Sequence, residues 1–209
     1  MKVSIFIYTL IIAASLALAS GATAAASPQT PAPFPDTAGH WAEEPIRALA
    51  GLGHVSGMPD GNFHPDEKIT LEQFVAMVIR GKYGVLPGDG GNWASGYMKM
   101  AAGKGLLDGA DITDDGIITR ETAAKVLDIA TQSLWGEDSV NDTSAAESYI
   151  TDFPSCHTCR THISNVFTRG IMTGKPGGIF DSAGTLTRAE ACVAIMRLLD
   201  KNLRVPPEL

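Results

Sequence analysis

The sequence is poor in cysteine, in positive charge and in long apolar runs. Three cysteines in 209 residues are too few for a scaffold built on disulfides. Sixteen Lys and Arg stand against 23 Asp and Glu, and the net charge of −7 argues against nucleic acid or an anionic membrane as a bulk electrostatic partner. After the N-terminal stretch, no apolar run is long enough to cross a bilayer.

The sequence also lacks the common signatures of catalysis. It contains no Gly-x-Ser-x-Gly, no His-Glu-x-x-His and no phosphate-binding glycine-rich loop with lysine. The acidic residues are dispersed, and solvation and helix capping explain them. We therefore predict a protein that is not an enzyme, with no catalytic residue and no cofactor.

The N-terminus has the order of a secretory signal peptide. Lys2 precedes an apolar stretch from Val3 to Leu18, which a run of small residues follows. The apolar core is shorter than the roughly 20 residues of a spanning helix. We predict cleavage near Ala26 and a mature protein that is secreted and associated with the cell wall or cell surface, with no membrane contact after cleavage.

One pattern occurs three times in the remaining chain. The first and third copies keep a constant offset of 117 residues without a gap, from Ile46 with Ile163 to Arg80 with Arg197. The middle copy is looser and its central loop is about three residues shorter, although it retains Trp93. Each copy predicts a helix, a loop rich in Gly, Pro and Asp, and a second helix that a threonine introduces as N-cap.

The first copy resembles an S-layer homology motif. The resemblance rests on three phrases of that copy, namely His40-Trp41-Ala42, Pro59-Asp60-Gly61-Asn62-Phe63-His64-Pro65 and Ile69-Thr70. It implies an all-α fold in which three helix-loop-helix repeats form a pseudo-threefold helical bundle. Physical reasoning agrees, because one repeat of about 50 residues buries too little surface alone.

The repeat divides the chain into seven segments. We predict a signal peptide at 1–26, a short linker at 27–33, the three motifs at 34–84, 85–135 and 152–201, an exposed acidic linker at 136–151 between the second and third, and a tail at 202–209.

The resemblance further implies binding of a cell wall polysaccharide, a pyruvylated secondary polymer or a related envelope glycan, in grooves between motifs. The family's signature is Thr-Arg-Ala-Glu at the start of the second helix, where the guanidinium can pair with a ketal carboxylate. The third motif matches it fully, the second keeps Thr and Arg, and the first has Leu71 in place of Arg, so at least one groove is expected to be degenerate. The predicted glycan-binding residues are Arg188, Thr187, Glu190, Arg120, Thr119, Trp41, Trp93, Asp60, Gly61 and Lys175.

Alternatives stay open for several of these residues. Trp41 and Trp93 can lie against a sugar ring or form wedges between helices. Asp60-Gly61 can contact sugar hydroxyls, but it is also an ordinary turn sequence. Lys175 lies in the third loop, which has lost that acid, and adds a cation instead.

The sequence Cys156-His157-Thr158-Cys159 is the chain's most unusual local departure from the repeat. It permits a small disulfide between Cys156 and Cys159, a zinc site with His157 and His162, or a loop without special function. Zinc is disfavoured because Cys156 and its neighbour His157 tend to point apart, and we assign no metal ligand. Cys192 lies among apolar residues and predicts a buried thiol.

A stretch from Asp111 to Thr122 partly fits a calcium loop, although its twelfth place lacks the acid that would bind the ion through both oxygens. It remains a minor alternative. The preferred function is non-catalytic anchoring to the envelope glycan. The alternatives are an envelope structural or assembly protein that contacts a protein partner, and a small secreted protein that responds to metal or redox state through Cys156 and Cys159.

Overall fold

The computed structural model describes residues 33–108 and 115–207, and in these residues the extended regular elements are all helices. The predicted all-α class is therefore confirmed. None of the described helices is long and apolar enough to cross a membrane. The helices are η1 (Pro35–Thr37), α1 (Glu43–Gly51), α2 (Leu71–Tyr83), α3 (Ser95–Gly103), α4 (Arg120–Ser133), α5 (Ser144–Tyr149), α6 (His157–Thr168), α7 (Arg188–Leu199) and η2 (Lys201–Leu203).

The second helices of the three repeats, α2, α4 and α7, all begin in the same way. Their N-caps are Thr70, Thr119 and Thr187, each with extended backbone and a side-chain oxygen that accepts the N–H of the residue three positions later. This bond satisfies one of the N–H groups that a helix start leaves without a partner. The predicted threonine caps are thus present in all three repeats.

The segments that lead into these helices pair with one another around a ring. Ile69 N–H donates to the carbonyl of Leu186, and Ile118 N–H donates to the carbonyl of Ile69, both at 3.1 Å. A bridge between Thr119 and Thr185 joins the remaining pair. The ring places the three repeats in equivalent positions, as a pseudo-threefold bundle requires.

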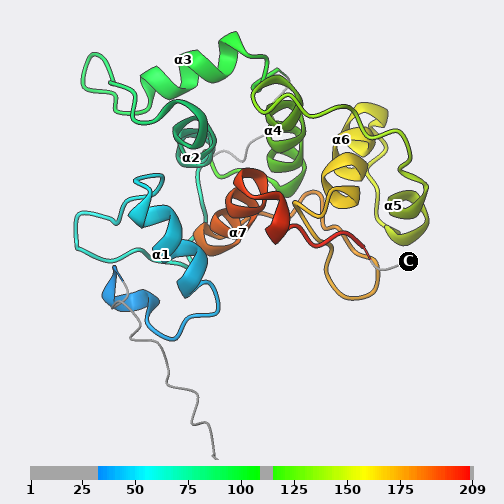
Figure 1. Cartoon of the computed structure of the whole chain (residues 1–209), viewed down its shortest axis with the longest axis horizontal. Coiled ribbons are helices and arrows are strands. Elements are labelled where there is room, and N and C mark those ends of the chain that lie inside the picture. The colour runs from blue at the N-terminus through cyan, green and yellow to red at the C-terminus, as the bar shows by residue number, and fades with distance from the viewer. Residues whose placement is uncertain (1–32, 109–114, 208–209) are drawn as a thin grey trace, which may run out of the picture. The chain divides into compact units, whose positions relative to one another are not determined.

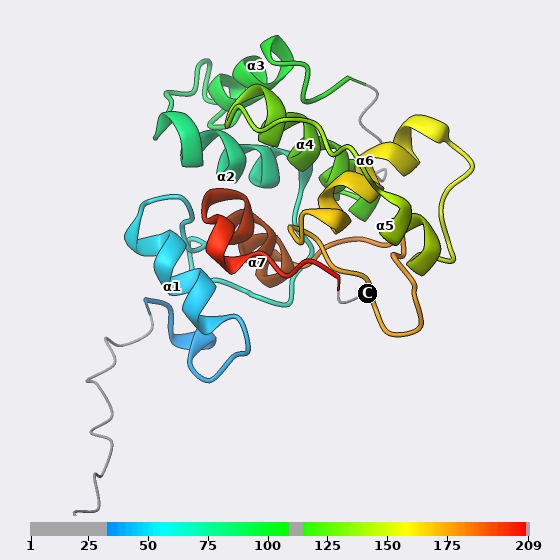
Figure 2. The same cartoon turned by 45° about the vertical axis from the view of Figure 1, so that its right-hand side comes forward.

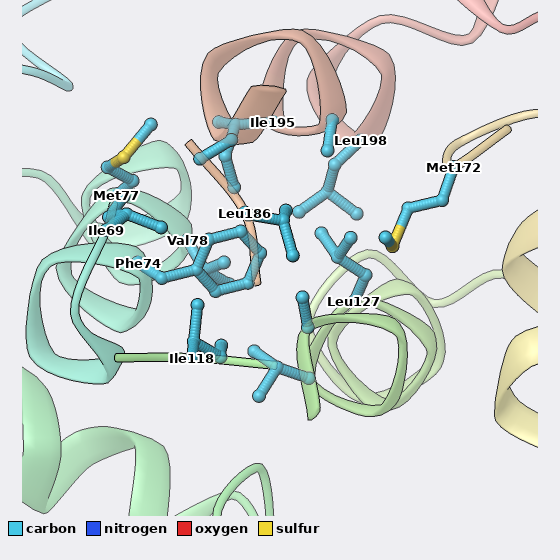
Figure 3. Packing of buried hydrophobic residues seen from close by; sticks show 14 of the residues in the cluster. Ile69, Phe74, Met77, Val78, Ile118, Leu127, Met172, Leu186, Ile195 and Leu198 are labelled. Atoms are coloured by element: carbon cyan, nitrogen blue, oxygen red, sulfur yellow. The ribbon is translucent and has the colours of Figure 1, made fainter. Parts of the chain in front are cut away.

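The core lies where the ring meets the three capped helices. Ile69, Ile118 and Leu186 point from the ring toward Phe74 of α2 and Leu127 of α4 (Figure 3). All five side chains are buried. Burying an apolar side chain of this size contributes about 1.5–3 kcal/mol, so one shared core stabilises three repeats that are each too small alone.

The first helix of each repeat packs against the second helix of the preceding repeat. Thus α3 packs against α2, α6 against α4, and α1 closes the circle against α7 (Figures 1 and 2). The chain therefore forms three equivalent interfaces between repeats. A site at one of these interfaces therefore combines residues from different repeats.

The segment 136–151 differs from the exposed linker that we predicted. It contains α5, whose Ala146 is buried and is followed by a buried Ile150. Glu137 is half-buried, and its carboxylate accepts hydrogen bonds from Arg169 and Arg204. Apolar side chains spaced by four residues and a paired acid explain why this acidic segment packs on the bundle. The predicted signal peptide and the first four residues of the calcium-loop sequence lie outside the described residues.

Candidate functional site

Two cavities lie at equivalent interfaces between repeats. Groove 1, of about 240 Å³, is formed by the loop after α1, by α2, by Trp93 ahead of α3 and by Arg188 at the start of α7. Groove 2, of about 220 Å³, is formed by the loop after α6, by α7, by Trp41 ahead of α1 and by Arg120 at the start of α4. Both are smaller than sites for drug-sized ligands, so each suits a small group such as one sugar residue.

The two grooves correspond residue by residue. At the sequence offset of 117, groove 1 residues from the first repeat match groove 2 residues from the third, including Gln73 with Glu190 and Arg80 with Arg197. In each groove a tryptophan then comes from the next repeat in the ring, and a buried arginine comes from the remaining one. One groove therefore needs all three repeats.

The arginines Arg188 and Arg120 are held in fixed orientations. Each is only 6% exposed, and each donates from Nε to a backbone carbonyl at 2.8 Å, that of Phe63 for Arg188 and that of Phe180 for Arg120. The Nη2 atoms donate to the carbonyls of Ser56 at 3.2 Å and Thr173 at 3.0 Å. Neutral carbonyls orient each guanidinium without cancelling its charge.

Each arginine also lies over the ring of its phenylalanine partner, with the guanidinium carbon of Arg188 4.4 Å from the Phe63 ring centroid and that of Arg120 5.0 Å from the Phe180 centroid. Burial lowers the pKa of both arginines, but arginine starts so high that it stays charged. Since no bond of their Nη1 groups is found within the described residues, these donors remain for a ligand.

The tryptophans are exposed at the groove walls. Trp41 is 64% exposed and Trp93 is 49% exposed, which excludes the alternative that they are buried wedges between helices. An exposed indole beside a fixed cation offers an apolar face and one N–H donor. This pairing suits the apolar face of a sugar ring that carries an acidic substituent.

A second arginine lies in each groove, but its surroundings differ. In groove 1, the Nε of Arg80 donates to the hydroxyl of Tyr97 at 2.8 Å. In groove 2, the guanidinium of Arg197 has no hydrogen bond or ion pair with any residue in 33–108 or 115–207. Burial lowers its pKa too. These second cations are functional candidates that our sequence analysis missed, although their constant spacing of 117 residues was a usable signal.

The grooves also differ in charge. Glu190 lies in groove 2, where its carboxylate accepts the N–H of Thr187 at 2.8 Å. Its negative charge partly offsets the lowering of the Arg120 pKa by burial. Gln73 occupies the same place in groove 1 and makes the same cap with a neutral amide. Lys175, also in groove 2, pairs with Asp181, and this bond lowers the pKa of the Asp181 carboxyl. Groove 1 is therefore the less acidic of the two.

The remaining predicted glycan-binding residues lie elsewhere. Thr119 and Thr187 cap helices and do not line either groove. Asp60 and Gly61 form a turn outside the two grooves, where the Asp60 carboxylate accepts from the Asn62 N–H and contacts His64. The complete signature of the third repeat is also divided, because its arginine lines groove 1 while its glutamate lines groove 2.

The third interface, where α4 packs against α6, lacks both arginines of the grooves. Leu71 stands where the grooves have their buried arginine, and Ile129 stands where they have their second arginine. The disulfide between Cys156 and Cys159 lies in the segment that carries tryptophan in the other repeats. That a groove relying on position 71 is degenerate stays a prediction.

A polar network occupies the interior of the third interface. Asp128 of α4 is buried and lies 2.8 Å from Nδ1 of His162. It also accepts hydrogen bonds from Asn165 and Gln132, both at 3.0 Å. Asp128 thus joins α4 to α6 through His162 and Asn165.

Comparison with known proteins identifies the repeat. Residues 33–75 and 149–192 match the model of the S-layer homology domain. The chain is 28% identical to an amylopullulanase of Thermoanaerobacterium thermosulfurigenes and 27% identical to the exoglucanase XynX of Acetivibrio thermocellus, in both cases over 81% of this chain. It is 30% identical to the S-layer protein EA1 of Bacillus anthracis, also over 81%.

The matched regions are small parts of these relatives. They make up 10% of the amylopullulanase, 16% of the exoglucanase and 20% of the S-layer protein. Further relatives are described as cell surface and outer membrane proteins, among them SlpA of Deinococcus radiodurans, 34% identical over 38% of this chain and 7% of that protein. The family and the cell-surface location predicted from the sequence are confirmed.

Proposed function

From these S-layer homology domains we propose that the chain anchors itself non-covalently to the cell envelope by binding an anionic glycan in grooves 1 and 2. The observation that carries the proposal is the repeated constellation of exposed tryptophan and fixed, buried arginine, Trp93 with Arg188 and Trp41 with Arg120. A tryptophan without a ligand, or an arginine with a purely structural role, would not need this pairing in both grooves.

The chemistry of the grooves suits a sugar that carries a carboxylate. The indole can cover the apolar face of the ring, while the Nη1 group of the buried arginine and the second arginine can donate to the carboxylate. Hydrogen bonds between charged groups are worth about 1.5–3 kcal/mol each, or roughly ten- to a hundredfold in affinity. Two such grooves on one chain would raise its avidity for a long polymer further.

We specify the ligand as a pyruvylated secondary cell wall polymer, because a pyruvyl ketal places a carboxylate directly on a sugar ring. The proposed role involves no reaction. Two relatives have names of carbohydrate-degrading enzymes, but the matched region is at most 16% of either protein. The matched region is therefore a poor basis for assigning catalysis to this chain.

Co-sedimentation with purified cell wall sacculi tests the proposal. Wild type should pellet with intact sacculi and stay in the supernatant after the secondary polymer is removed. Arg188→Ala should weaken binding and Arg120→Ala/Arg188→Ala should abolish it. Glycan anchoring would be refuted if wild type failed to pellet with intact sacculi, or if it bound equally well after polymer removal.

A second pair of variants guards against misfolding, because each buried arginine also bonds two backbone carbonyls. Trp41→Ala and Trp93→Ala alter exposed side chains, so their stability should stay within about 0.5 kcal/mol of wild type while binding falls about fivefold or more. Leu52→Ala is the matched control, since Leu52 is 63% exposed and lies outside both grooves. Polymer from which the pyruvyl groups have been removed should bind wild type and all variants weakly.

A further inference from the structure

The entrance of the third interface gathers three groups that bind soft metal ions. One carboxylate oxygen of Glu121 and the sulfur atoms of Cys156 and Cys159 all lie within 4.8 Å of one another. Glu121 comes from the first turn of α4, and the cysteines come from the start of α6. The packing of α4 against α6 therefore builds this cluster, which we call the Cys2Glu cluster.

The local backbone holds both cysteines on one side of the helix start. Cys156 is the N-cap of α6, and its sulfur accepts the N–H of Cys159 at 3.2 Å. Such a bond favours the thiolate form once the disulfide is reduced. Cys156 is exposed and Cys159 is half-buried, so a reductant and an ion can reach the pair from solvent.

We propose that, after reduction of the disulfide, Cys156, Cys159 and Glu121 bind one zinc ion, with solvent completing a tetrahedral site. Zinc–sulfur bonds of about 2.3 Å and zinc–oxygen bonds of about 2.0–2.2 Å place neighbouring ligand atoms roughly 3.3–3.8 Å apart. The cluster needs only small side-chain movements to reach these spacings. Two thiolates and a carboxylate also leave a site without net positive charge.

This ligand set differs from the one that the sequence suggested. His162 is committed elsewhere, because its Nδ1 lies 2.8 Å from Asp128 in the interior of the interface. Glu121 replaces it from a different repeat, 35 residues before Cys156 in the chain. The objection that Cys156 and its neighbour His157 tend to point apart therefore does not apply to the Cys2Glu cluster.

Metal binding and the disulfide exclude one another. A dithiol reductant transfers two electrons and two protons to the Cys156–Cys159 bond, forms its own disulfide and leaves two thiols. Zinc then binds both sulfurs and displaces two protons. The third interface would thus hold either a disulfide or a zinc ion, and neither state touches the grooves.

Cobalt(II) titration of the reduced full chain tests the site, because cobalt reports tetrahedral thiolate ligands by its visible and ultraviolet absorption. The protein is reduced with a phosphine, freed of it, and titrated with Co²⁺ and then with Zn²⁺. We expect one Co²⁺ per chain with a thiolate-to-metal charge-transfer band, and loss of the band on adding Zn²⁺. Oxidised protein should show no such band.

Variants assign the ligands. Cys156→Ser should abolish the charge-transfer band, whereas Cys192→Ala should keep it, because Cys192 is buried and burial raises the pKa of its thiol to about 12. Glu121→Gln should weaken Co²⁺ binding by about tenfold or more. Its matched control is Glu72→Gln, at the corresponding place in α2, which should bind as wild type does.

Two results would overturn the proposal. The first is a reduced chain that keeps its helical circular dichroism but shows no thiolate-to-metal band. The second is equal Co²⁺ affinity in Glu121→Gln and Glu72→Gln, which would remove Glu121 from the site. A reduced chain that unfolds would contradict it as well, since the cluster depends on the packing of α4 against α6.

Discussion

Grooves 1 and 2 and the third interface occupy equivalent positions in the ring of repeats, but different residues line them. The grooves combine a fixed arginine, a second arginine and an exposed tryptophan around a cavity. The third interface has Leu71 and Ile129 at the two cationic positions, and there Asp128 of α4 bonds to His162 and Asn165 of α6. The comparison teaches that helix packing between repeats is kept at all three places, while the arginine pair occurs at two of them.

The largest expected effect separates stability from binding. Asp128→Ala removes the partner of the buried Asn165, the half-buried His162 and the exposed Gln132, and should lower the free energy of unfolding by about 3 kcal/mol. Polymer binding at temperatures where the variant is folded should be unchanged. Urea denaturation together with sacculi co-sedimentation measures both quantities.

The control for this substitution is Asp66→Ala, which removes another aspartate paired with a histidine. Asp66 is largely exposed and lies 3.3 Å from His40, so its loss should cost less than about 1 kcal/mol. If the two variants are equally stable, the Asp128 network does not hold the third interface together.

A smaller effect should follow from exchanging the charge between the grooves. Glu190→Gln makes groove 2 resemble groove 1, keeps the helix cap as Gln73 does, and removes a negative charge close to Arg120. Its affinity for the anionic polymer should rise about threefold, and Gln73→Glu should lower the affinity of groove 1 by a similar factor. Calorimetric titration in low salt measures both; shifts in the same direction would contradict the assigned roles.

The smallest expected effect is a pH dependence confined to groove 1, where His54 stands in place of Ile171. Burial and the charge of Arg80 lower the pKa of His54 below its ordinary value of about 6.5. A bound carboxylate raises that pKa again, so binding takes up protons and should strengthen about two- to threefold as the pH falls from 7.5 to about 5.5.

His54→Ile is the matched control for this pH effect, because it installs the groove 2 residue. The variant should bind with the same affinity at both pH values. A pH dependence that persists in His54→Ile would assign the proton to another group in the groove.

The sequence predicted those parts of the molecule that repeat. The threonine caps, the helical class and the places of Arg120 and Arg188 at helix starts follow from a four-residue signature and a constant offset. It could not show that neighbouring signature residues face different grooves, as Arg188 and Glu190 do, because that depends on how three repeats close into a ring.

The departures from prediction have physical causes of the same kind. The acidic segment 136–151 was expected to be solvated, but Arg204 of the tail pairs with Glu137 from 67 residues away. Likewise, the approach of Glu121 to Cys156 and Cys159 depends on the packing of α4 against α6. Long-range partners of this kind leave no periodic signal in one sequence.

The most direct test of the central claim is the number of polymer sites on one chain. Calorimetric titration with a short, soluble fragment of the purified polymer should give two sites for wild type, one for Arg188→Ala, one for Arg120→Ala and none for the double variant, with each variant's fold checked by circular dichroism. A third site in wild type, or an unchanged site number in the folded single variants, would contradict the division between two binding grooves and a third interface that lacks both arginines.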